Sequence, residues 1–293
     1  MERLGNGIVG MTKNLISRRR FLTCAGAGGL GLAGYAGLME PFRLVIGRHE
    51  CKTSAPNPGL PLKVLHLSDL HASWAVSLDF IDKAVQLGLQ LKPDLICLTG
   101  DYITCKYEAF DAYGRVLAKL SAAAPAFACL GNHDGGRYSK AHGGYETTQN
   151  VRQFLQRCRI QLLDNRCAAL RINGREVILS GLADIWSENV NLAAAFPDAQ
   201  ADGAAVRIVL SHNPDTKELL RFFPWDLLLC GHTHGGQVVL PWLGAPWAPV
   251  RDKRFIAGLY SWDNRWIHIT PGVGNVHGVR FNCPPEVSLI TVI

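Results

Sequence analysis

Short apolar runs alternate with segments of helical periodicity along most of the chain. The apolar runs predict buried strands at Val64–Ser68, Leu95–Thr99, Ala126–Leu130, Val177–Gly181, Val206–Ser211 and Asp226–Cys230. Apolar residues at helical spacing between several of these runs predict helices at Leu78–Leu91, Glu108–Ser121, Thr148–Arg157 and Asp215–Phe222. Strands that alternate with helices indicate an α/β fold with a partly parallel sheet.

The C-terminal part of the chain has a different pattern. Apolar runs there predict strands at Phe255–Leu259, Trp266–Thr270 and Val287–Val292, with no long helical segment between them. We therefore expect the alternating part and the strand-rich end to form one α/β sandwich of two sheets.

The first 40 residues predict a targeting segment. Residues 17–22 read S-R-R-R-F-L, and a glycine-rich apolar stretch, Phe21–Met39, follows. A basic region before an apolar segment is the general form of an export signal, and this one resembles the signal of the bacterial twin-arginine pathway. Two alternatives are a plain transmembrane anchor, since 19 residues is just long enough to span, and a buried helix, for which six glycines make a poor interior.

The segment 41–60 contains several prolines and predicts a linker. We therefore expect a signal or anchor at 1–40, the linker, and one domain at 61–293. The export machinery would be a partner, and it would carry the domain to the periplasm or to the outer face of the inner membrane of a bacterium. If the signal is retained, its arginines hold the N-terminus on the cytoplasmic side.

Composition and charge narrow the class of protein further. A chain of 293 residues with 48% hydrophobic and 18% charged residues can bury a substantial core. The net charge is +6, but the first 20 residues carry five basic side chains against one acidic side chain. The rest of the chain is therefore nearly neutral, so we expect no nucleic-acid partner.

The nine cysteines do not predict a zinc knuckle, because the sequence has no C-x-x-C pair. Cys97, Cys129 and Cys230 lie within apolar runs, where cysteine acts as a small buried hydrophobic residue. We expect most cysteines to be reduced. Disulfide partners in an exported domain would come from Cys51, Cys105, Cys158, Cys167 and Cys283.

Five predicted strands are each followed by residues of metal-binding type. These are Asp69-Leu70-His71, Asp101, Asn132-His133-Asp134, His212 and His232-Thr233-His234. The carboxyl ends of strands in an open α/β sheet line one crevice, so we expect the five clusters to meet there. Glycines beside them allow tight turns and close backbone contacts.

The residue types in these clusters suit two divalent ions. Imidazole, carboxylate and amide ligands together favour Mn, Fe, Zn or Ni over Mg or Ca. Two such ions bridged by a carboxylate can promote an in-line phosphoryl displacement, with a hydroxide between them as the nucleophile. A histidine that is not a ligand can then protonate the leaving oxygen.

In this order, the five clusters resemble the full motif set of the calcineurin-like metallophosphoesterase family, and the resemblance covers residues 61–293. It implies a four-layer α/β/β/α sandwich of two mixed sheets and a metal-dependent phosphodiesterase. The segments SHNPDTKE, PWDLLLCGHTHGGQ, APVRDKRFIAGLY and GVGNVHGVRFNCPPEV resemble a narrower bacterial branch of that family. Some members of this branch hydrolyse UDP-2,3-diacylglucosamine in lipid A biosynthesis.

The resemblance also implies a role for each residue. Asp69, His71 and His234 would bind the first metal ion; Asn132, His212 and His232 would bind the second; and Asp101 would bridge both. His133 would act near the leaving group, with Asp134 orienting it. We expect both ions to be manganese, with iron, zinc or nickel as alternatives.

Several residues near the motifs have two interpretations each. Arg137 and Arg280 could hold a substrate phosphate or lie on the surface as ordinary arginines. His277 could face the substrate or occupy a simple turn. Trp242 and Trp247, in the loop 240–250, could contact acyl chains or a membrane surface, or pack beneath their own loop. We interpret His66, in the apolar run before Asp69, as a core histidine or one that supports the motif residues, while His49 and His268 belong to no motif.

The resulting hypothesis is hydrolysis of a phosphodiester or pyrophosphate bond, with a lipid-linked nucleotide such as UDP-2,3-diacylglucosamine as one substrate. A phosphomonoesterase or nuclease of the same fold and a non-catalytic metal-binding scaffold are the alternatives. The complete set of metal-type residues argues against the scaffold. A UDP-linked substrate is made on the cytoplasmic side, whereas the export signal places the domain outside.

Overall fold

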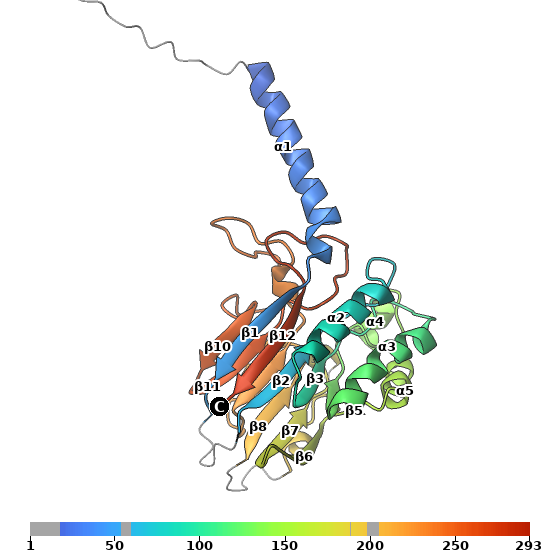
Figure 1. Cartoon of the computed structure of the whole chain (residues 1–293), viewed down its shortest axis with the longest axis vertical. Helices are drawn as coiled ribbons and strands as arrows, with labels where there is room; N and C mark the ends of the chain where they lie inside the picture. The colour runs from blue at the N-terminus through green and yellow to red at the C-terminus, as the bar shows by residue number, and fades with distance from the viewer. Residues whose placement is uncertain (1–17, 54–59, 188, 198–204) are drawn as a thin grey trace, which may run out of the picture.

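Two six-stranded β-sheets pack face to face in the part of the chain that is described, residues 18–53, 60–187, 189–197 and 205–293 of a computed structural model (Figure 1). In order across the first sheet lie β1 (Val45–Cys51), β12 (Glu286–Val292), β2 (Leu62–Leu67), β3 (Leu95–Thr99), β4 (Ala126–Cys129) and β5 (Gln161–Leu162). The second sheet has the order β10 (Gly258–Trp262), β11 (Arg265–Ile269), β9 (Leu227–Cys230), β8 (Val206–Leu210), β7 (Arg175–Gly181) and β6 (Arg166–Ile172).

Both sheets are mixed, and the directions of their strands determine where the loops after the strands lie. The strands β2, β3, β4 and β5 run parallel, while β12 runs antiparallel to β2 and parallel to β1. In the second sheet β7, β8, β9 and β11 run parallel, with β6 and β10 antiparallel at the edges. The carboxyl ends of the central strands therefore lie along one edge of each sheet.

Helices cover the outer faces of the two sheets. On the first sheet lie α2 (Leu78–Gln90), α3 (Phe110–Ala123) and α5 (Gln149–Arg157), packed on one hydrophobic cluster (Figure 1). The side chain of Ser77 caps α2 by accepting a hydrogen bond from the Phe80 N–H, and α2 buries Phe80, Ile81 and Val85. The short helix α6 (Leu192–Ala195) and the 3₁₀ helix η3 (Pro214–Glu218) lie along the second sheet. The expected four-layer α/β/β/α sandwich is confirmed, with a thin outer layer on the second sheet.

A second cluster fills the space between the sheets, with Leu62, Val64 and Leu95 on one side and Ile208 and Leu229 on the other. Central strands are thus buried on both faces, which explains why they read as continuous apolar runs. Their predicted bounds are right to within one or two residues. The helix expected at Asp215–Phe222 is only the short η3, and the strand expected at Phe255–Leu259 begins at Gly258.

Three edge strands lie outside the predicted elements: β1, β6 and the two-residue β5. β6 has only the short apolar run Cys167–Leu170 between two arginines, and its residues alternate between exposed and partly buried positions. β1 lies inside the segment 41–60 that was expected to be a linker, and it pairs along its whole length with β12. The linker expectation is therefore wrong for Val45–Cys51, because an edge strand with a polar outer face resembles a loop in sequence.

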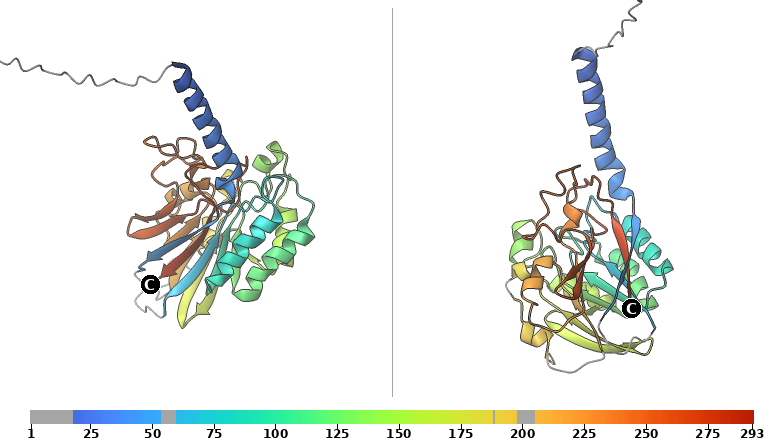
Figure 2. Two further views of the ribbon diagram at one scale, coloured as in Figure 1. Left: turned by 45° about the horizontal axis from the view of Figure 1, so that its top comes forward. Right: turned by 90° about the vertical axis from the view of Figure 1, so that its left-hand side faces the viewer.

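The helix α1 (Arg18–Leu38) precedes β1 and projects away from the sandwich (Figure 2). Its six glycines do not prevent the helix, and a Cβ added at any of them would meet open space. Its end is attached to the domain, because the Arg280 N–H donates to the Ala36 carbonyl at 2.9 Å. Within the described residues, no helix combines the length and apolar character that a membrane crossing requires. Residues 1–17, and with them Ser17 of the expected signal, lie outside the described residues.

All eight cysteines whose side chains are described are free thiols. Cys97, Cys129 and Cys230 are buried in the core, as the sequence predicts, and burial raises the pKa of each above its usual value.

Candidate metal centre

The metal-type residues gather at the carboxyl ends of five strands, three in the first sheet and two in the second. Asp69 and His71 follow β2, Asp101 follows β3, Asn132 follows β4, His212 follows β8, and His232 and His234 follow β9. All seven side chains are buried. The expectation that these clusters meet in one place is therefore met by the geometry.

One half of the centre is built by Asp69, His71 and His234. His234 Nε2 lies 3.3 Å from Asp69 Oδ1 and 3.2 Å from His71 Nε2, and His71 Nε2 lies 3.9 Å from Asp69 Oδ1. Donor atoms this close around a common point are suited to a shared cation. These are the three residues that the family resemblance assigns to a first metal ion.

Asp101 lies between the two halves of the centre. Its Oδ2 is 3.4 Å from His71 Nε2 and 3.2 Å from His212 Nε2. On the far side, His212 Nε2 is 3.2 Å from His232 Nδ1. Asp101 is thus placed to act as the bridging carboxylate, with His212 and His232 in the second half.

Neighbouring groups hold the histidine rings so that one nitrogen faces the centre. The Nδ1 of His212 donates to the Thr99 carbonyl at 2.7 Å, and the Nδ1 of His71 lies 3.1 Å from Thr104 Oγ1. In each case the Nε2 is left for the centre, which is the usual arrangement of a metal-binding histidine. The Oδ1 of Asn132 is also buried, and it has no hydrogen-bond partner among the described residues. These features fit divalent metal ions held by oxygen and nitrogen.

Burial determines the charge of these groups. Desolvation lowers the pKa of His71 and that of His232 to about 3, so both imidazoles are neutral, which is the form that binds a metal. Desolvation raises the pKa of Asp69 to about 6. Burial is also the largest single influence on Asp101 and acts in the same direction, but the charge and hydrogen bond of His212, together with His133 and His71, outweigh it and hold the pKa of Asp101 well below its usual value.

Backbone conformation at the centre is strained. Asp69, His71, Asp101, His232 and His234 all have φ between 48° and 68°, in the left-handed region that residues other than glycine rarely adopt. Such conformations persist only where the surrounding structure enforces them, and they cluster at functional sites. The contacts are close: a side chain at Gly131 would overlap the Asp101 carboxylate, and one at Gly231 would overlap the Asp69 carboxylate. Glycine is required at both positions.

His133 lies beside the centre, while Asp134 does not contact its ring. The His133 ring is centred 5.0 Å from the ring of His71, and its Nδ1 bonds the Thr104 carbonyl at 2.8 Å. The Asp134 carboxylate instead accepts backbone N–H bonds from Asp101, Tyr102 and Gly131 at 2.8–2.9 Å. The expectation that Asp134 orients His133 is therefore wrong. Thr104 orients that ring, and Asp134 ties the loops after β3 and β4 together.

The centre opens into a cavity of about 700 Å³. Besides centre residues, its lining includes Tyr138, Trp186, Trp247, Val276, His277 and Val279. The exposed side chain of His277 therefore lies at the cavity, as one interpretation of the sequence expected. Arg137 is exposed on α4 (Arg137–Ala141) and lines a smaller neighbouring pocket with Asn132 and Trp186.

Arg280 cannot contact a substrate in this structure. Its side chain is fully buried, and its guanidinium donates to the carbonyls of Pro271, Gly272, Gly274 and Cys283. Both interpretations of Arg280 are thus wrong, since it neither lies on the surface nor faces the cavity. It holds together the loop that follows β11.

Three residues that shape the centre lie outside the clusters of metal-binding type. Thr104 contacts both His71 and His133, Thr99 holds His212 through its backbone, and the Trp186 ring packs edge-on against the His232 ring at 4.5 Å. Thr104 follows Asp101 closely in the chain, which is the one signal that could have pointed to it. Trp186 comes from the loop after β7, far from any motif.

The calcineurin-like phosphoesterase family model matches residues 62–236, which hold every residue of the centre. The chain belongs to the calcineurin-like phosphoesterase family. It is therefore a hydrolase of the metallophosphoesterase class, and the motif order that the sequence showed is that of the family.

Three relatives place the chain within this phosphoesterase family. Phosphodiesterase YaeI of Escherichia coli is 40% identical over 95% of this chain and its own full length. The uncharacterised metallophosphoesterase YkuE of Bacillus subtilis is 30% identical over 94% of this chain and 98% of its own length. The UDP-2,3-diacylglucosamine pyrophosphatase LpxG of Chlamydia trachomatis is 27% identical over 78% of this chain and 83% of its own.

Proposed function

We propose that this chain is a dinuclear metal-dependent phosphodiesterase that hydrolyses a phosphodiester or pyrophosphate bond. The observation that carries the proposal is the position of Asp101 between two sets of inward-facing ligand atoms, 3.4 Å from His71 Nε2 and 3.2 Å from His212 Nε2. A carboxylate between two groups of imidazoles is the arrangement that two ions and one bridge require.

The residues that would hold the ions divide between the two halves. Asp69, His71 and His234 would bind one, Asn132, His212 and His232 would bind the other, and Asp101 would contact both. When bound, the ions supply Lewis-acid stabilisation of the phosphoryl oxygens and an activated water. Manganese is our first choice, with iron, zinc or nickel as alternatives for the same mixed donor set.

The remaining chemistry belongs to side chains of the protein. His133 Nδ1 is held by the Thr104 carbonyl, so Nε2 is the nitrogen left to donate a proton to the leaving oxygen. The ring lines the cavity beside Asp101 and His232, where a substrate phosphate would lie. The centre is buried and the cavity is open, so a phosphate group can enter while the bulk of the substrate stays in the wider part.

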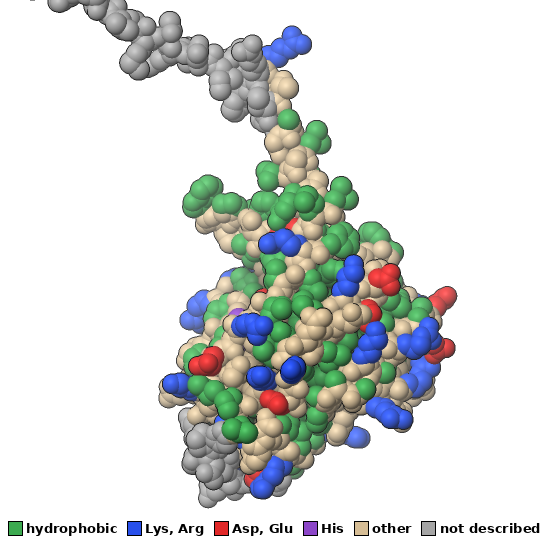
Figure 3. All heavy atoms as spheres, in the orientation of Figure 1, with side chains coloured by type: hydrophobic (Ala, Val, Ile, Leu, Met, Phe, Trp, Pro, Cys, Tyr) green, Lys and Arg blue, Asp and Glu red, His purple; other side chains and the backbone are tan. Residues whose placement is uncertain are grey.

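Substrate class follows from the apolar rim of this cavity. Trp247, Val276 and Val279 line it, and Trp242, Leu243, Leu38 and Met39 are exposed nearby on the loop 240–250 and at the end of α1. Figure 3 shows hydrophobic side chains gathered where α1 meets the domain. We propose an amphiphilic substrate such as a nucleotide linked to a lipid, a class that includes the substrate in the name of LpxG.

The same rim suits contact with a lipid surface. The Trp242 side chain is completely exposed, with no protein neighbour covering it, and α1 leaves the domain from the same end (Figure 1). Tryptophan is enriched at membrane interfaces because its ring is amphipathic. We propose that this end of the domain meets the membrane and that the arginine-led N-terminus directs export to the outer face of the inner membrane. On that face the amphiphilic substrate would be a molecule of the cell envelope, whereas a UDP-linked lipid would require the domain to face the cytoplasm.

The proposed reaction is tested with the purified full chain. With Mn²⁺ it should cleave a generic aryl phosphodiester, and a chelator should abolish the activity. Given UDP-2,3-diacylglucosamine, hydrolysis should release UMP and a lipid monophosphate, detected by mass spectrometry. Cleavage of the aryl diester without the lipid nucleotide would keep the reaction class and exclude that substrate; failure on both would refute the proposal.

The lipid contact has its own test. The Trp242→Ala and Trp247→Ala variants should bind anionic phospholipid vesicles more weakly in a flotation assay, with hydrolysis of the small aryl diester retained by Trp242→Ala. Phe222→Ala is the matched control, since Phe222 is 92% exposed but precedes the amino end of β9, away from the cavity. Equal vesicle binding by all three variants and the parent chain would contradict the membrane contact.

A further inference from the structure

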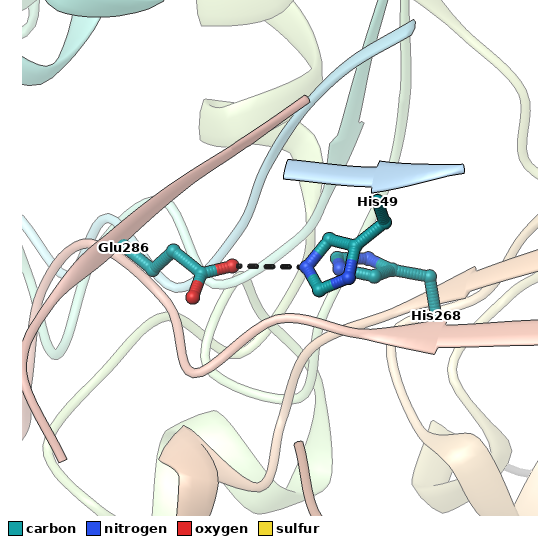
Figure 4. A group of neighbouring side chains, drawn as sticks. All are labelled: His49, His268 and Glu286. Carbon is teal, nitrogen blue, oxygen red and sulfur yellow. Dashed lines mark ion pairs between the residues drawn. The ribbon is translucent and has the colours of Figure 1, made fainter. Parts of the chain in front are cut away.

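The interior of the sandwich holds another group of histidine and carboxylate side chains, away from the catalytic centre. His49 lies on β1, His268 on β11 and Glu286 at the start of β12 (Figure 4). One ligand atom from each lies within 4.8 Å of the others, and His49 Nε2 is 3.8 Å from Glu286 Oε1. Since β1 and β12 belong to the first sheet and β11 to the second, this group joins the two sheets.

Strand alternation explains why these side chains meet. Along β1 the odd-numbered residues turn inward, so His49 faces the second sheet while Arg48 and Glu50 are exposed. Along β12 the even-numbered residues face the same way, with Ile290 in the cluster between the sheets. His268 comes from the facing strand and is fully buried.

Hydrogen bonds fix the His268 ring and leave one nitrogen bare. His268 Nδ1 lies 2.9 Å from His66 Nδ1, and His66 Nε2 lies 2.8 Å from Thr99 Oγ1. If the His66 Nε2–H donates to Thr99, then His66 Nδ1 accepts from the His268 Nδ1–H. His268 Nε2 then carries a lone pair, and it is buried with no hydrogen-bond partner among the described residues.

The Nε2 of His49 is likewise buried without a hydrogen bond among the described residues. Desolvation lowers the pKa of His268 well below its usual value, so this imidazole is neutral. A neutral imidazole with one nitrogen held by a hydrogen bond and the other bare is the state in which histidine binds a metal.

The carboxylate of Glu286 is positioned in a comparable way. The Ser288 hydroxyl donates to Glu286 Oε1 at 2.6 Å and lies 3.1 Å from Thr270 Oγ1. Gly47, the inward-facing residue before His49 on β1, leaves the space that the carboxylate occupies, because a side chain there would overlap it. Glu286 can therefore lie across β1 and reach His49.

We propose that His49, His268 and Glu286 form a further metal site, which binds a late first-row divalent ion such as Zn²⁺. Two imidazoles and one carboxylate are a donor set that zinc accepts. A tetrahedral ion with bonds of about 2.0–2.1 Å would draw the ligand atoms to roughly 3.3 Å from one another, which requires only small side-chain movements. Solvent can supply the fourth ligand, because the side chains of His49 and Glu286 are 22% and 17% exposed.

An ion at this site would act as a clamp. It would tie β1, the edge strand that follows α1, to β12 beside it and to β11 across the sandwich. The site is separate from the catalytic centre in its residues, since none of its three ligands contacts Asp101 or the histidines of that centre within the described hydrogen bonds and ion pairs.

The test is total metal content of the full chain, measured by inductively coupled plasma mass spectrometry after equilibration with Mn²⁺ and Zn²⁺ and removal of free ions. The parent chain should hold one more equivalent of divalent metal than His49→Ala and Glu286→Gln. Glu50→Gln is the matched control, since Glu50 is exposed on the opposite face of β1, and it should keep the parent's content. Hydrolysis of an aryl phosphodiester should stay within about twofold in all four proteins.

A second measurement distinguishes the loss of the metal site from misfolding of the variant. With Co²⁺ in place of Zn²⁺, the parent chain should show an absorption band of tetrahedral cobalt that is missing from Glu286→Gln, while the far-ultraviolet circular dichroism of the two proteins coincides. Equal metal content and equal cobalt spectra in the parent, His49→Ala and Glu286→Gln would overturn the proposal. The group would then be a hydrogen-bonded histidine cluster only.

Discussion

The sandwich contains two groups of histidines and carboxylates that are built in opposite ways. The catalytic centre lies on loops at strand ends, and five of its residues have left-handed backbone conformations. The group around His49, His66 and His268 lies within regular strands, and none of these residues has a positive φ. Strained loops place several ligand atoms around one small volume, whereas strands can offer only one side chain every second residue. Loops can therefore gather the ligand atoms that the proposed reaction requires, whereas regular strands suit a single structural ion.

The largest difference between the two groups should appear on removal of one carboxylate from each. Asp101→Asn should lower kcat/KM for an aryl phosphodiester by about a thousandfold or more, because a bridging ligand serves both ions and metal ions supply several kcal/mol of transition-state stabilisation. Glu286→Gln should change it less than about twofold. Comparable losses in the two variants, measured at saturating Mn²⁺, would show that the two groups are not functionally separate.

Within the centre, His133 should separate catalysis from metal binding. His133→Ala should lower kcat by about a hundredfold to ten-thousandfold, since it removes a general acid, with the metal content of the parent chain retained. His212→Ala should lose both activity and metal. If His133→Ala keeps its kcat, the role assigned to that ring is wrong.

Removal of the Asp134 carboxylate should lower the stability of the fold, although Asp134 belongs to a motif of metal-binding type. Asp134→Asn replaces one of two oxygens that accept backbone N–H bonds from Asp101, Tyr102 and Gly131. The amide NH₂ would face a backbone donor, so the free energy of unfolding should fall by roughly 1–3 kcal/mol. Urea denaturation measures the change, and Asp111→Asn is the control because the Asp111 side chain is 87% exposed. Equal stabilities would exclude the tie between the two loops.

The different construction also explains what the sequence could predict. Residues of the centre come in short motifs after apolar runs, such as Asp69-Leu70-His71, so their meeting place followed from the general rule for strand ends. The contact of Thr104 with His133 depends on loop conformation, which the motif does not specify. This is why Asp134 was assigned the wrong partner.

The histidine group within the strands, His49, His66 and His268, could not be predicted from the sequence for a different reason. His49 lies in an edge strand that resembles a linker, and its approach to His268 depends on how β1 and β12 pair and how the two sheets face each other. The sequence indicates neither the pairing of β1 with β12 nor the way in which the two sheets face each other. Only His66 was assigned correctly as a core histidine, because it sits within the apolar run before Asp69.

The last expected effect is a change in the pH dependence of stability. Burial lowers the pKa of His66 to about 3 from an ordinary value of 6.5, so between these pH values the unfolded chain binds a proton that the folded chain excludes. The free energy of unfolding therefore falls as the pH is lowered through this window, by up to about 1.4 kcal/mol per pH unit for this one ring.

His66→Gln should make that slope shallower, since glutamine keeps polar atoms near Thr99 and His268 but does not titrate. Urea denaturation of the metal-free protein between pH 4 and 6.5 would measure it, with His142→Gln as a control because His142 is exposed on the loop after α4. Parallel slopes for His66→Gln and the parent chain would mean that His66 takes up its proton in the folded state, and the neutral hydrogen-bonded chain from Thr99 to His268 would then not exist. A shallower slope would support that chain, and with it the bare nitrogen of His268 that distinguishes the histidine group within the strands from an ordinary histidine contact.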